Sequence, residues 1–197
     1  DDYLKLIKSL RDKQLFRQFA NLIHYKIYSD ITLEERIAFC KKVIVLHNYL
    51  MESLKFHFDK ESRHLDLSNN LELKIALCFQ NFPAESADFS HTKIENFICF
   101  RGQKLKSLNV SHTEIYELHS LNNYELKELD ISHTGVSNLS PIAGHSIRKL
   151  NISHSQIKSI QTVLKLSSLQ ELIVHKGQFS AVEYLLIPES IKVIAVD

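Results

Sequence analysis

The chain has few of the residues that interrupt helices and strands, and it has no long apolar segment. Its 197 residues include four glycines, three prolines and no tryptophan. So few glycines argue against loops that cradle a phosphate group. No run of 18 or more apolar residues occurs, so we expect no membrane-spanning helix and no membrane partner. The first residues, Asp1-Asp2-Tyr3-Leu4-Lys5, lack an initiator Met and the regions of a signal peptide, which predicts a processed chain or a fragment of a longer one.

Neither sign of charge is in clear excess. The chain carries 24 Lys and Arg against 23 Asp and Glu, a formal net charge of +1 with His neutral. Binding to a nucleic-acid backbone depends on a strong basic bias. We therefore expect no nucleic-acid partner.

One motif recurs along the C-terminal two thirds of the chain. Three copies are close in sequence: LKSLNVSHTEI from Leu105, LKELDISHTGV from Leu126 and IRKLNISHSQI from Ile147. Weaker copies lie on both sides of these three. The repeats share a central apolar anchor, and successive anchors are 21 or 22 residues apart: Leu65, Ala87, Leu108, Leu129, Leu150, Leu172 and Ile194. Self-similarity at this period predicts a solenoid, in which each repeat buries its apolar side against its neighbours.

Each repeat should supply one short strand. In the copy from Leu105, Leu108 and Val110 alternate with Asn109 and Ser111, so period-two alternation predicts that the first pair points inward and the second outward. Seven such strands would form a parallel sheet with a concave outer face, where solenoids usually bind their partners. We expect the binding residues on this face: Asp66, Asp88, Asn109, Ser111, Glu128, Asp130, Ser132, Lys149, Asn151 and Glu171.

The predicted face is polar and lacks the Trp, Tyr and Arg anchors that dominate interface energies, which favours a weak or multivalent contact.

The pattern L-x-x-L-x-L-x-x-(N/T)-x-L over residues 62–197 resembles the leucine-rich-repeat family. This resemblance implies an α/β fold, a leucine-rich-repeat solenoid with its parallel sheet on the concave face. Residues 136–144, V-S-N-L-S-P-I-A-G, are similar to the short bacterial repeats of internalin-like proteins. They are also similar to repeat regions attached to serine/threonine kinases of the planctomycete and Lentisphaera groups.

The chain departs from the family pattern at one position. The Asn that usually ladders along such solenoids is present once, as Asn70, and the position then holds Thr92, Thr113, Thr134, Ser155 and Gly177. A hydroxyl bonds fewer backbone groups than an amide, so these turns should be tighter.

Three cysteines, Cys40, Cys78 and Cys99, form an odd number without a framework spacing. Cytosolic proteins seldom keep disulfides, so free thiols in a cytoplasmic protein are favoured. Cys78 and Cys99 lie about one repeat apart, and a bridge between them stays open.

Residues 1–60 do not repeat and are predicted to form a helical cap, which leaves 61–197 as the repeat domain. Apolar residues at helical spacing predict helices within residues 3–10 and 15–23. Thr32-Leu33-Glu34-Glu35 is a capping box that opens a third helix running to Leu50. The alternation of Leu54, Phe56 and Phe58 indicates a short strand before the first repeat. This cap would cover the open apolar end of the solenoid; a separate recognition element is the alternative.

The C-terminal end has no such cover in the sequence. Ile191, Val193, Ala195 and Val196 lie on or near an edge strand that could pair with another chain. Either the chain is a fragment that has been cut at this point, or this edge is short and harmless, or it forms a homodimer.

Four histidines, His91, His112, His133 and His154, occupy one position in consecutive repeats. Stacked repeats would bring their rings to about 5 Å from one another. Neutral imidazole is a common metal ligand, so a shared metal ion is one interpretation; a turn residue copied with its repeat is the simpler one. Because like charges repel, the ladder should weaken below about pH 6.

The segment Asp130-Ile131-Ser132-His133 contains the residue types of a hydrolytic triad. The same residue types recur at the same positions of other repeats, which indicates a structural role and not a catalytic one. Kinase signatures are absent from the sequence. We therefore expect no catalytic residue and no cofactor.

The sequence predicts a protein–protein interaction module, and the C-terminal recognition region of a larger bacterial signalling protein, such as a serine/threonine kinase, is its expected context. A metal-binding protein that uses the histidine ladder is the alternative.

Overall fold

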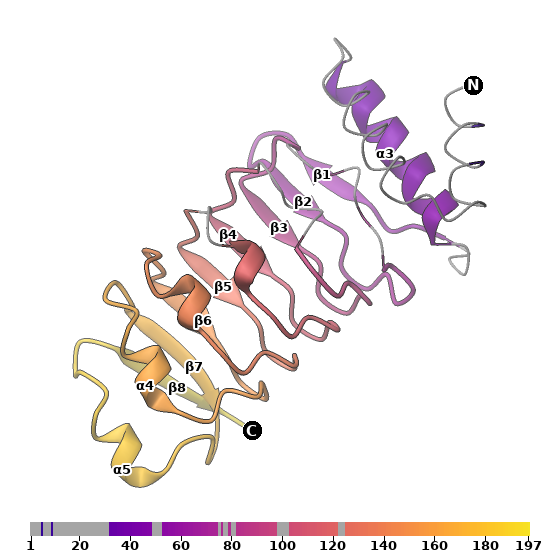
Figure 1. Cartoon of the computed structure of the whole chain (residues 1–197). Helices are drawn as coiled ribbons and strands as arrows, with labels where there is room; N and C mark the ends of the chain where they lie inside the picture. The colour runs from indigo at the N-terminus through magenta and orange to yellow at the C-terminus, as the bar shows by residue number, and fades with distance from the viewer. Residues whose placement is uncertain are drawn as a thin grey trace.

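The strands of the described residues form one eight-stranded sheet that runs along the molecule (Figure 1). The computed structural model describes residues 5, 9, 32–48, 53–74, 76, 79, 82–97, 103–121 and 125–197. The strands follow one another across the sheet in chain order: β1 (His57–Asp59), β2 (His64–Asp66), β3 (Ser86–Asp88), β4 (Ser107–Asn109), β5 (Glu128–Asp130), β6 (Lys149–Asn151), β7 (Glu171–His175) and β8 (Lys192–Val196). The seven predicted parallel strands, β2 to β8, are confirmed, and β1 pairs antiparallel with β2.

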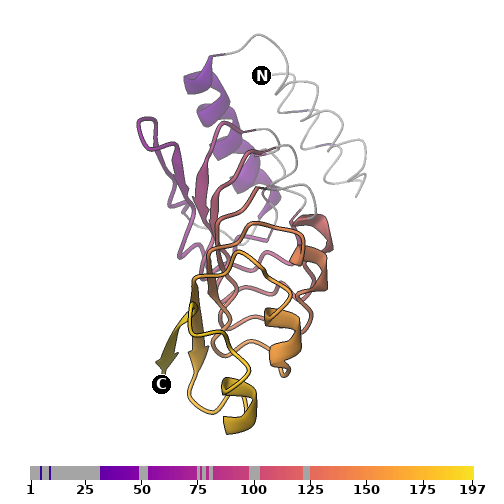
Figure 2. The same cartoon turned by 90° about the vertical axis from the view of Figure 1, so that its left-hand side faces the viewer.

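The return arms close the other side of the core. They contain the short helices η3 (His119–Leu121), η4 (Ser140–Ile142), α4 (Ile160–Val163) and α5 (Ala181–Tyr184). Figure 2 shows the strands along one side of the solenoid and η3, η4 and α4 along the other. Leu108, Val110, Ile115 and Leu118 are at most 1% exposed, which confirms their predicted inward orientation.

Helix α3 (Leu33–His47) begins where the capping box predicts. The Glu35 backbone N–H donates to Thr32 Oγ1 (3.2 Å), and the Thr32 N–H donates to Glu35 Oε2 (2.8 Å). The helix ends at His47 rather than at Leu50, because Asn48 caps it. The Asn48 amide donates to Ile44 O (2.8 Å) and its oxygen accepts from the Lys74 N–H (2.7 Å), so this residue joins the helix to the first repeat.

Helix α3 covers the N-terminal end of the solenoid core (Figure 1). Its Cys40, Val43 and Ile44 are buried in the same hydrophobic cluster as the repeat anchors. The predicted strand near Phe58 is confirmed as β1, which belongs to the sheet although it precedes residue 60. The division at residue 60 stays a prediction. The two helices predicted within residues 3–23 lie outside the described residues, apart from Lys5 and Ser9, which are helical.

At the turn position the hydroxyls make fewer bonds than the amide, as predicted, and the tighter turns stay a prediction. Asn70 Nδ2 donates to the carbonyls of Leu67 and Lys55 (both 2.7 Å), and Asn70 Oδ1 accepts from the Lys55 N–H (2.9 Å). The hydroxyls that replace it each bond the carbonyl three residues earlier, at 2.6–2.7 Å: Thr92, Thr113, Thr134 and Ser155. One amide therefore ties two segments together, where each hydroxyl closes only its own turn.

The predicted anchor of the last repeat is wrong by one residue. Leu172 pairs with Val193, and Ile194 pairs with Ile173 on the opposite face of the sheet. Residues 193–196 are all apolar, so the sequence alone does not distinguish the two faces, and register is weakly specified in such a strand. β7 and β8 are also longer than the other strands, with five residues against three.

Among the described residues, no helix is both long and apolar enough to cross a bilayer. Cys40 is fully buried. Cys78 and Cys99, between which a bridge was left open, lie outside the described residues.

Candidate interaction surface

Three rows of side chains cross the outer, concave face of the sheet, because the parallel register aligns equivalent residues of successive repeats. The charged row precedes the anchors and consists of Glu128, Lys149, Glu171 and Lys192. The Asx row follows the anchors and consists of Asp66, Asp88, Asn109, Asp130 and Asn151. The histidine row comes after the strands and begins at His91.

The Asx row shapes the end of each strand. In every member, one side-chain oxygen accepts the backbone N–H of the serine two residues later, at 2.8–3.1 Å. Asp and Asn favour this local turn because their short side chains reach their own backbone two residues on. The alternation of Asp and Asn also links repeats, since Asn109 Nδ2 donates to Asp88 Oδ2 (3.0 Å) and Asn151 Nδ2 donates to Asp130 Oδ2 (2.8 Å). These predicted binding residues therefore make bonds that hold the fold.

Ser111 and Ser132, which were predicted on the binding face, are buried, so little of either side chain is accessible to a partner. They are 7% and 5% exposed. The strands end at Asn109 and Asp130, so period-two alternation no longer applies two residues later. Ser132 Oγ donates to Asp130 Oδ1 (2.7 Å), so the hydroxyl is used within the turn.

The charged row carries alternating signs over four consecutive strands. Lys149 and Lys192 lie on either side of Glu171, each with an N–O distance of 3.1 Å. Hydrogen bonds from Lys192 and then from Lys149 hold the pKa of the Glu171 carboxyl below its usual value. Glu128 and both lysines are exposed, so this row presents the open charges of the concave face.

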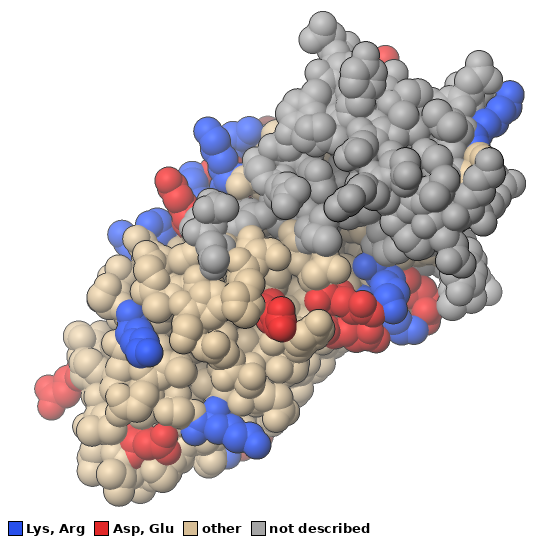
Figure 3. All heavy atoms as spheres, in the orientation of Figure 1, with Lys and Arg blue, Asp and Glu red and all other residues tan. Residues whose placement is uncertain are grey.

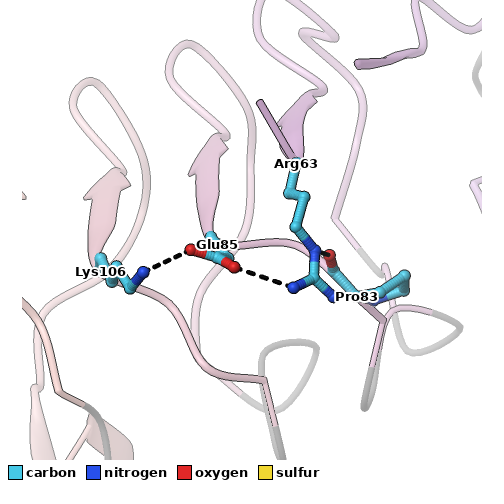
Figure 4. Close-up of polar contacts among 4 residues, drawn as sticks. All are labelled: Arg63, Pro83, Glu85 and Lys106. Carbon is cyan, nitrogen blue, oxygen red and sulfur yellow. Dashed lines mark hydrogen bonds and ion pairs between the residues drawn. The ribbon is translucent and has the colours of Figure 1, made fainter. Parts of the chain in front are cut away.

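A second chain of ion pairs lies just before the strands at the other end of the sheet (Figure 4). Glu85 accepts from Arg63 (2.8 Å) and from Lys106 (2.5 Å), while Arg63 Nε donates to the carbonyl of Pro83 (3.0 Å). These residues line an open depression of about 480 Å³ together with Lys104 and others. The sequence analysis did not include this cluster, because Arg63, Glu85 and Lys106 occupy a variable position of the repeat pattern, two residues before the anchors.

The predicted histidine ladder is present and is one ring longer than expected. The rings of His91, His112, His133 and His154 stack with centroids 4.0–4.3 Å apart and planes within 20° of parallel. Each of the four residues has a positive φ of 53–55°. Asn and His are enriched in this left-handed region, which explains why Asn69 (φ 58°) occupies the same position in the first repeat.

His175 is the ring that sequence reasoning missed. It stacks on His154 at 4.8 Å. His175 lies three residues after its anchor Leu172, whereas the other histidines lie four residues after theirs, so it falls out of the sequence pattern. Its Nδ1 accepts the His154 backbone N–H (3.2 Å), a bond that goes to a serine carbonyl in the three preceding repeats.

The stack disfavours protonation of its inner members. Burial lowers the pKa of His112, and the neighbouring His91 lowers it further, against an opposing effect of the Asp130 carboxylate. Burial, followed by the charges of His112 and His154, lowers the pKa of His133 in the same way. Burial and like charges nearby both disfavour the protonated form of an imidazole.

The stack has poor geometry for a metal ion. Nitrogen lone pairs lie in the ring planes, so in nearly parallel rings they point along parallel lines and do not converge on one point. Within the part of the chain that the structure describes, no group of three or more His, Cys, Asp or Glu side chains gathers as a metal site. No observation therefore favours the metal-binding alternative.

Comparison with known proteins places the fold. No protein-family model matches the chain, and no curated protein does so. Among solved structures, an internalin from Listeria monocytogenes superposes with a TM-score of 0.53 at 15% sequence identity, covering 89% of this chain and 54% of the internalin. The chain thus spans about half the length of that protein. Together with the seven stacked parallel strands, the match shows that this chain has the leucine-rich-repeat solenoid fold found in internalin.

Proposed function

We propose that this chain is a protein–protein interaction module that binds through the charged row of its concave face. The observation that supports this is the alternation Glu128, Lys149, Glu171, Lys192 along four aligned strands, with both lysines about half or more exposed. Exposed ion pairs contribute little to folding stability. Charge patterns of this kind act more strongly on partner choice and association rate.

The other rows of the face are less suited to the task. The side-chain oxygens of the Asx row already accept hydrogen bonds within turns and between repeats, and its members are only half-exposed. A partner with a complementary alternation of charges would therefore find its matching groups mainly on the charged row.

A charge-reversal variant tests this proposal. Glu128→Lys, Lys149→Glu, Glu171→Lys and Lys192→Glu together keep the net charge and the pairs within the row, while inverting the pattern that a partner meets. The matched control, Glu114→Lys with Lys158→Glu, exchanges exposed charges in the return arms. In affinity capture from a lysate of the source organism, we expect a partner that binds the native chain and the control but is lost from the reversed variant. A partner retained by the reversed variant contradicts the proposed surface.

We also propose a location and a parent protein for this chain, both from its sequence. A cytoplasmic location follows from the cysteine usage, and attachment to a larger bacterial signalling protein such as a serine/threonine kinase follows from the resemblance around Pro141. A full-length reading frame without a kinase domain would contradict that attachment.

A further inference from the structure

Three positively charged side chains lie in register where the strands begin. Lys106, Lys127 and Arg148 each lie two residues before the anchor of their repeat, and we call them the basic row. Backbone hydrogen bonds align them, because the Lys127 N–H donates to the Lys106 carbonyl and the Arg148 N–H donates to the Lys127 carbonyl, both at 2.7 Å. Successive members are therefore about 4.8 Å apart along the solenoid, the spacing of neighbouring strands.

Most of the charge of the basic row is not neutralised by the chain itself. Glu85 pairs with Lys106 at one end of the row (Figure 4). In the part of the chain that the structure describes, Lys127 and Arg148 make neither an ion pair nor a side-chain hydrogen bond. Like charges opposite each other on neighbouring strands are destabilising. The row therefore lowers the stability of the free chain, and a bound anion would relieve this repulsion.

The basic row is accessible and borders open space. Lys106 and Arg148 are exposed and Lys127 is half-buried. At Lys106 the row reaches the depression of about 480 Å³, which is also lined by the exposed Lys104. Figure 3 shows Lys and Arg side chains along the upper left edge of the molecule, where the strands begin, whereas most described side chains on the return-arm side in front are uncharged.

We propose that the basic row binds an acidic helix of a partner protein, whose carboxylates at positions i, i+3 and i+7 face Lys106, Lys127 and Arg148. Side chains at this spacing lie on one face of a helix. With a rise of about 1.5 Å per residue they lie at about 0, 4.5 and 10.5 Å along the helix, close to the spacing of the row at about 0, 4.8 and 9.6 Å. In an extended peptide the side chains of one face are about 6.8 Å apart, so three of them overshoot the row by about 4 Å.

The surroundings of the row favour a short acidic helix over a long polyanion. Glu85 pairs with Lys106, and Glu125 and Glu128 lie within two residues of Lys127 along the chain. A nucleic-acid backbone would bring phosphates close to these carboxylates, which repel them. A helix presents neutral or basic side chains beside its acidic face, and these can lie over the same glutamates. This surface is separate from the charged row of the concave face and does not depend on it.

A titration with two peptides of equal composition tests the geometry of the partner. Both are capped, rich in alanine and glutamine, about 18 residues long so that a helix can form, and carry three glutamates. The one-faced peptide has its glutamates at i, i+3 and i+7, and the control peptide has them spread around the helix. In nuclear magnetic resonance titrations of the native chain at low ionic strength, where charges are least screened, we expect the one-faced peptide to bind at least threefold more tightly. Equal affinity for the two peptides overturns the proposal.

Substitutions test whether the basic row is the site. Lys127→Gln with Arg148→Gln should weaken binding of the one-faced peptide about tenfold. Lys158→Gln with Lys165→Gln removes the same charge from exposed lysines of the return arms and should leave the affinity unchanged. Lys127→Arg with Arg148→Lys keeps the charge and should retain binding. None of these side chains is buried, so every variant should keep its thermal transition in circular dichroism. Equal weakening by the two Gln pairs overturns the proposal.

A charge-matched competitor separates the acidic helix from phosphate-bearing ligands. We expect an oligothymidylate with three phosphates to bind the native chain more weakly than the one-faced peptide does. Tighter binding of the oligothymidylate that is lost with Lys127→Gln and Arg148→Gln would assign the row to phosphate groups and overturn the proposal. The variants leave Lys149, Glu171 and Lys192 unchanged, so loss of peptide binding here and loss of a partner from the charged row are separate results.

Discussion

The two ends of the solenoid begin their helices in the same way but bury them very differently. Both α3 and α5 start with a capping box, Thr32 with Glu35 and Ser180 with Glu183. Ile44 of α3 is fully buried, whereas α5 has no buried residue and is followed by the 85% exposed Leu185. Local sequence chemistry thus decides where a helix begins. The amount of core that it covers depends on what lies beyond it in the fold.

The largest expected effect is at the covered end. Ile44→Ala removes a fully buried side chain and should lower the free energy of unfolding by about 2–5 kcal/mol. Leu185→Ala, just after α5, should change it by less than about 0.5 kcal/mol, because the Leu185 side chain is already in solvent. Urea denaturation followed by circular dichroism measures both. Similar losses for the two variants would show that α3 does not close the core.

A second contrast separates the first turn from the later ones. Asn70→Ala leaves the Lys55 N–H and two carbonyls without their partner, and we expect a loss of about 3 kcal/mol. Thr113→Val removes a single bond to the Val110 carbonyl and should cost about 1 kcal/mol. Denaturation midpoints of the two variants give the comparison, and a larger loss for Thr113→Val would reverse our ranking of the turns.

The left-handed turns offer a test in the middle of the solenoid. His133 has φ 53°, so His133→Val should cost about 1–2 kcal/mol, because a β-branched residue is strained there. His133→Asn is the matched control: asparagine already occupies this conformation at Asn69, and stability should change little. If both variants melt at the native temperature, the left-handed conformation is not what selects histidine.

The smallest effect concerns acid. The folded-state pKa values of His112 and His133 lie below the ordinary value of 6.5, so the unfolded chain takes up protons more readily. Their contribution to stability is therefore present above pH 6.5 and is lost as the pH falls through the folded values. We expect a lower urea midpoint at pH 5.5 than at pH 7.5. The double variant His112→Asn, His133→Asn should show a smaller decrease, and an undiminished one would assign the acid sensitivity to other groups.

Residues that repeat were predictable, and residues that interrupt the repeat were not. Leu108, Thr113 and the histidines at anchor plus four recur with the same neighbours, so their roles follow from one local pattern. Val193 and His175 lie where β7 and β8 lengthen and the turn shifts by one residue, to Gly177 with φ 77°. In the last strand both the odd-numbered and the even-numbered residues from 193 to 196 are apolar, so the period-two pattern does not reveal this shift.

The predicted binding face shows the same division. Asp88 and Asp130 were expected to be available to a partner, but their oxygens bond the backbone of Ser90 and Ser132. The alternating charges of Glu128, Lys149 and Glu171 form a row only because the strands that carry them pair in register.

The sequence by itself determined the solenoid, its period, its turn chemistry and the start of α3, because each of these depends on contacts within a repeat or between identical positions of neighbouring repeats. Only the tertiary structure decided which residue of β8 pairs with the anchor Leu172, which polar groups hold turns, and that α3 is buried against the core while α5 has no buried residue. These features depend on contacts between segments far apart in the chain, and such contacts leave no local pattern in the sequence.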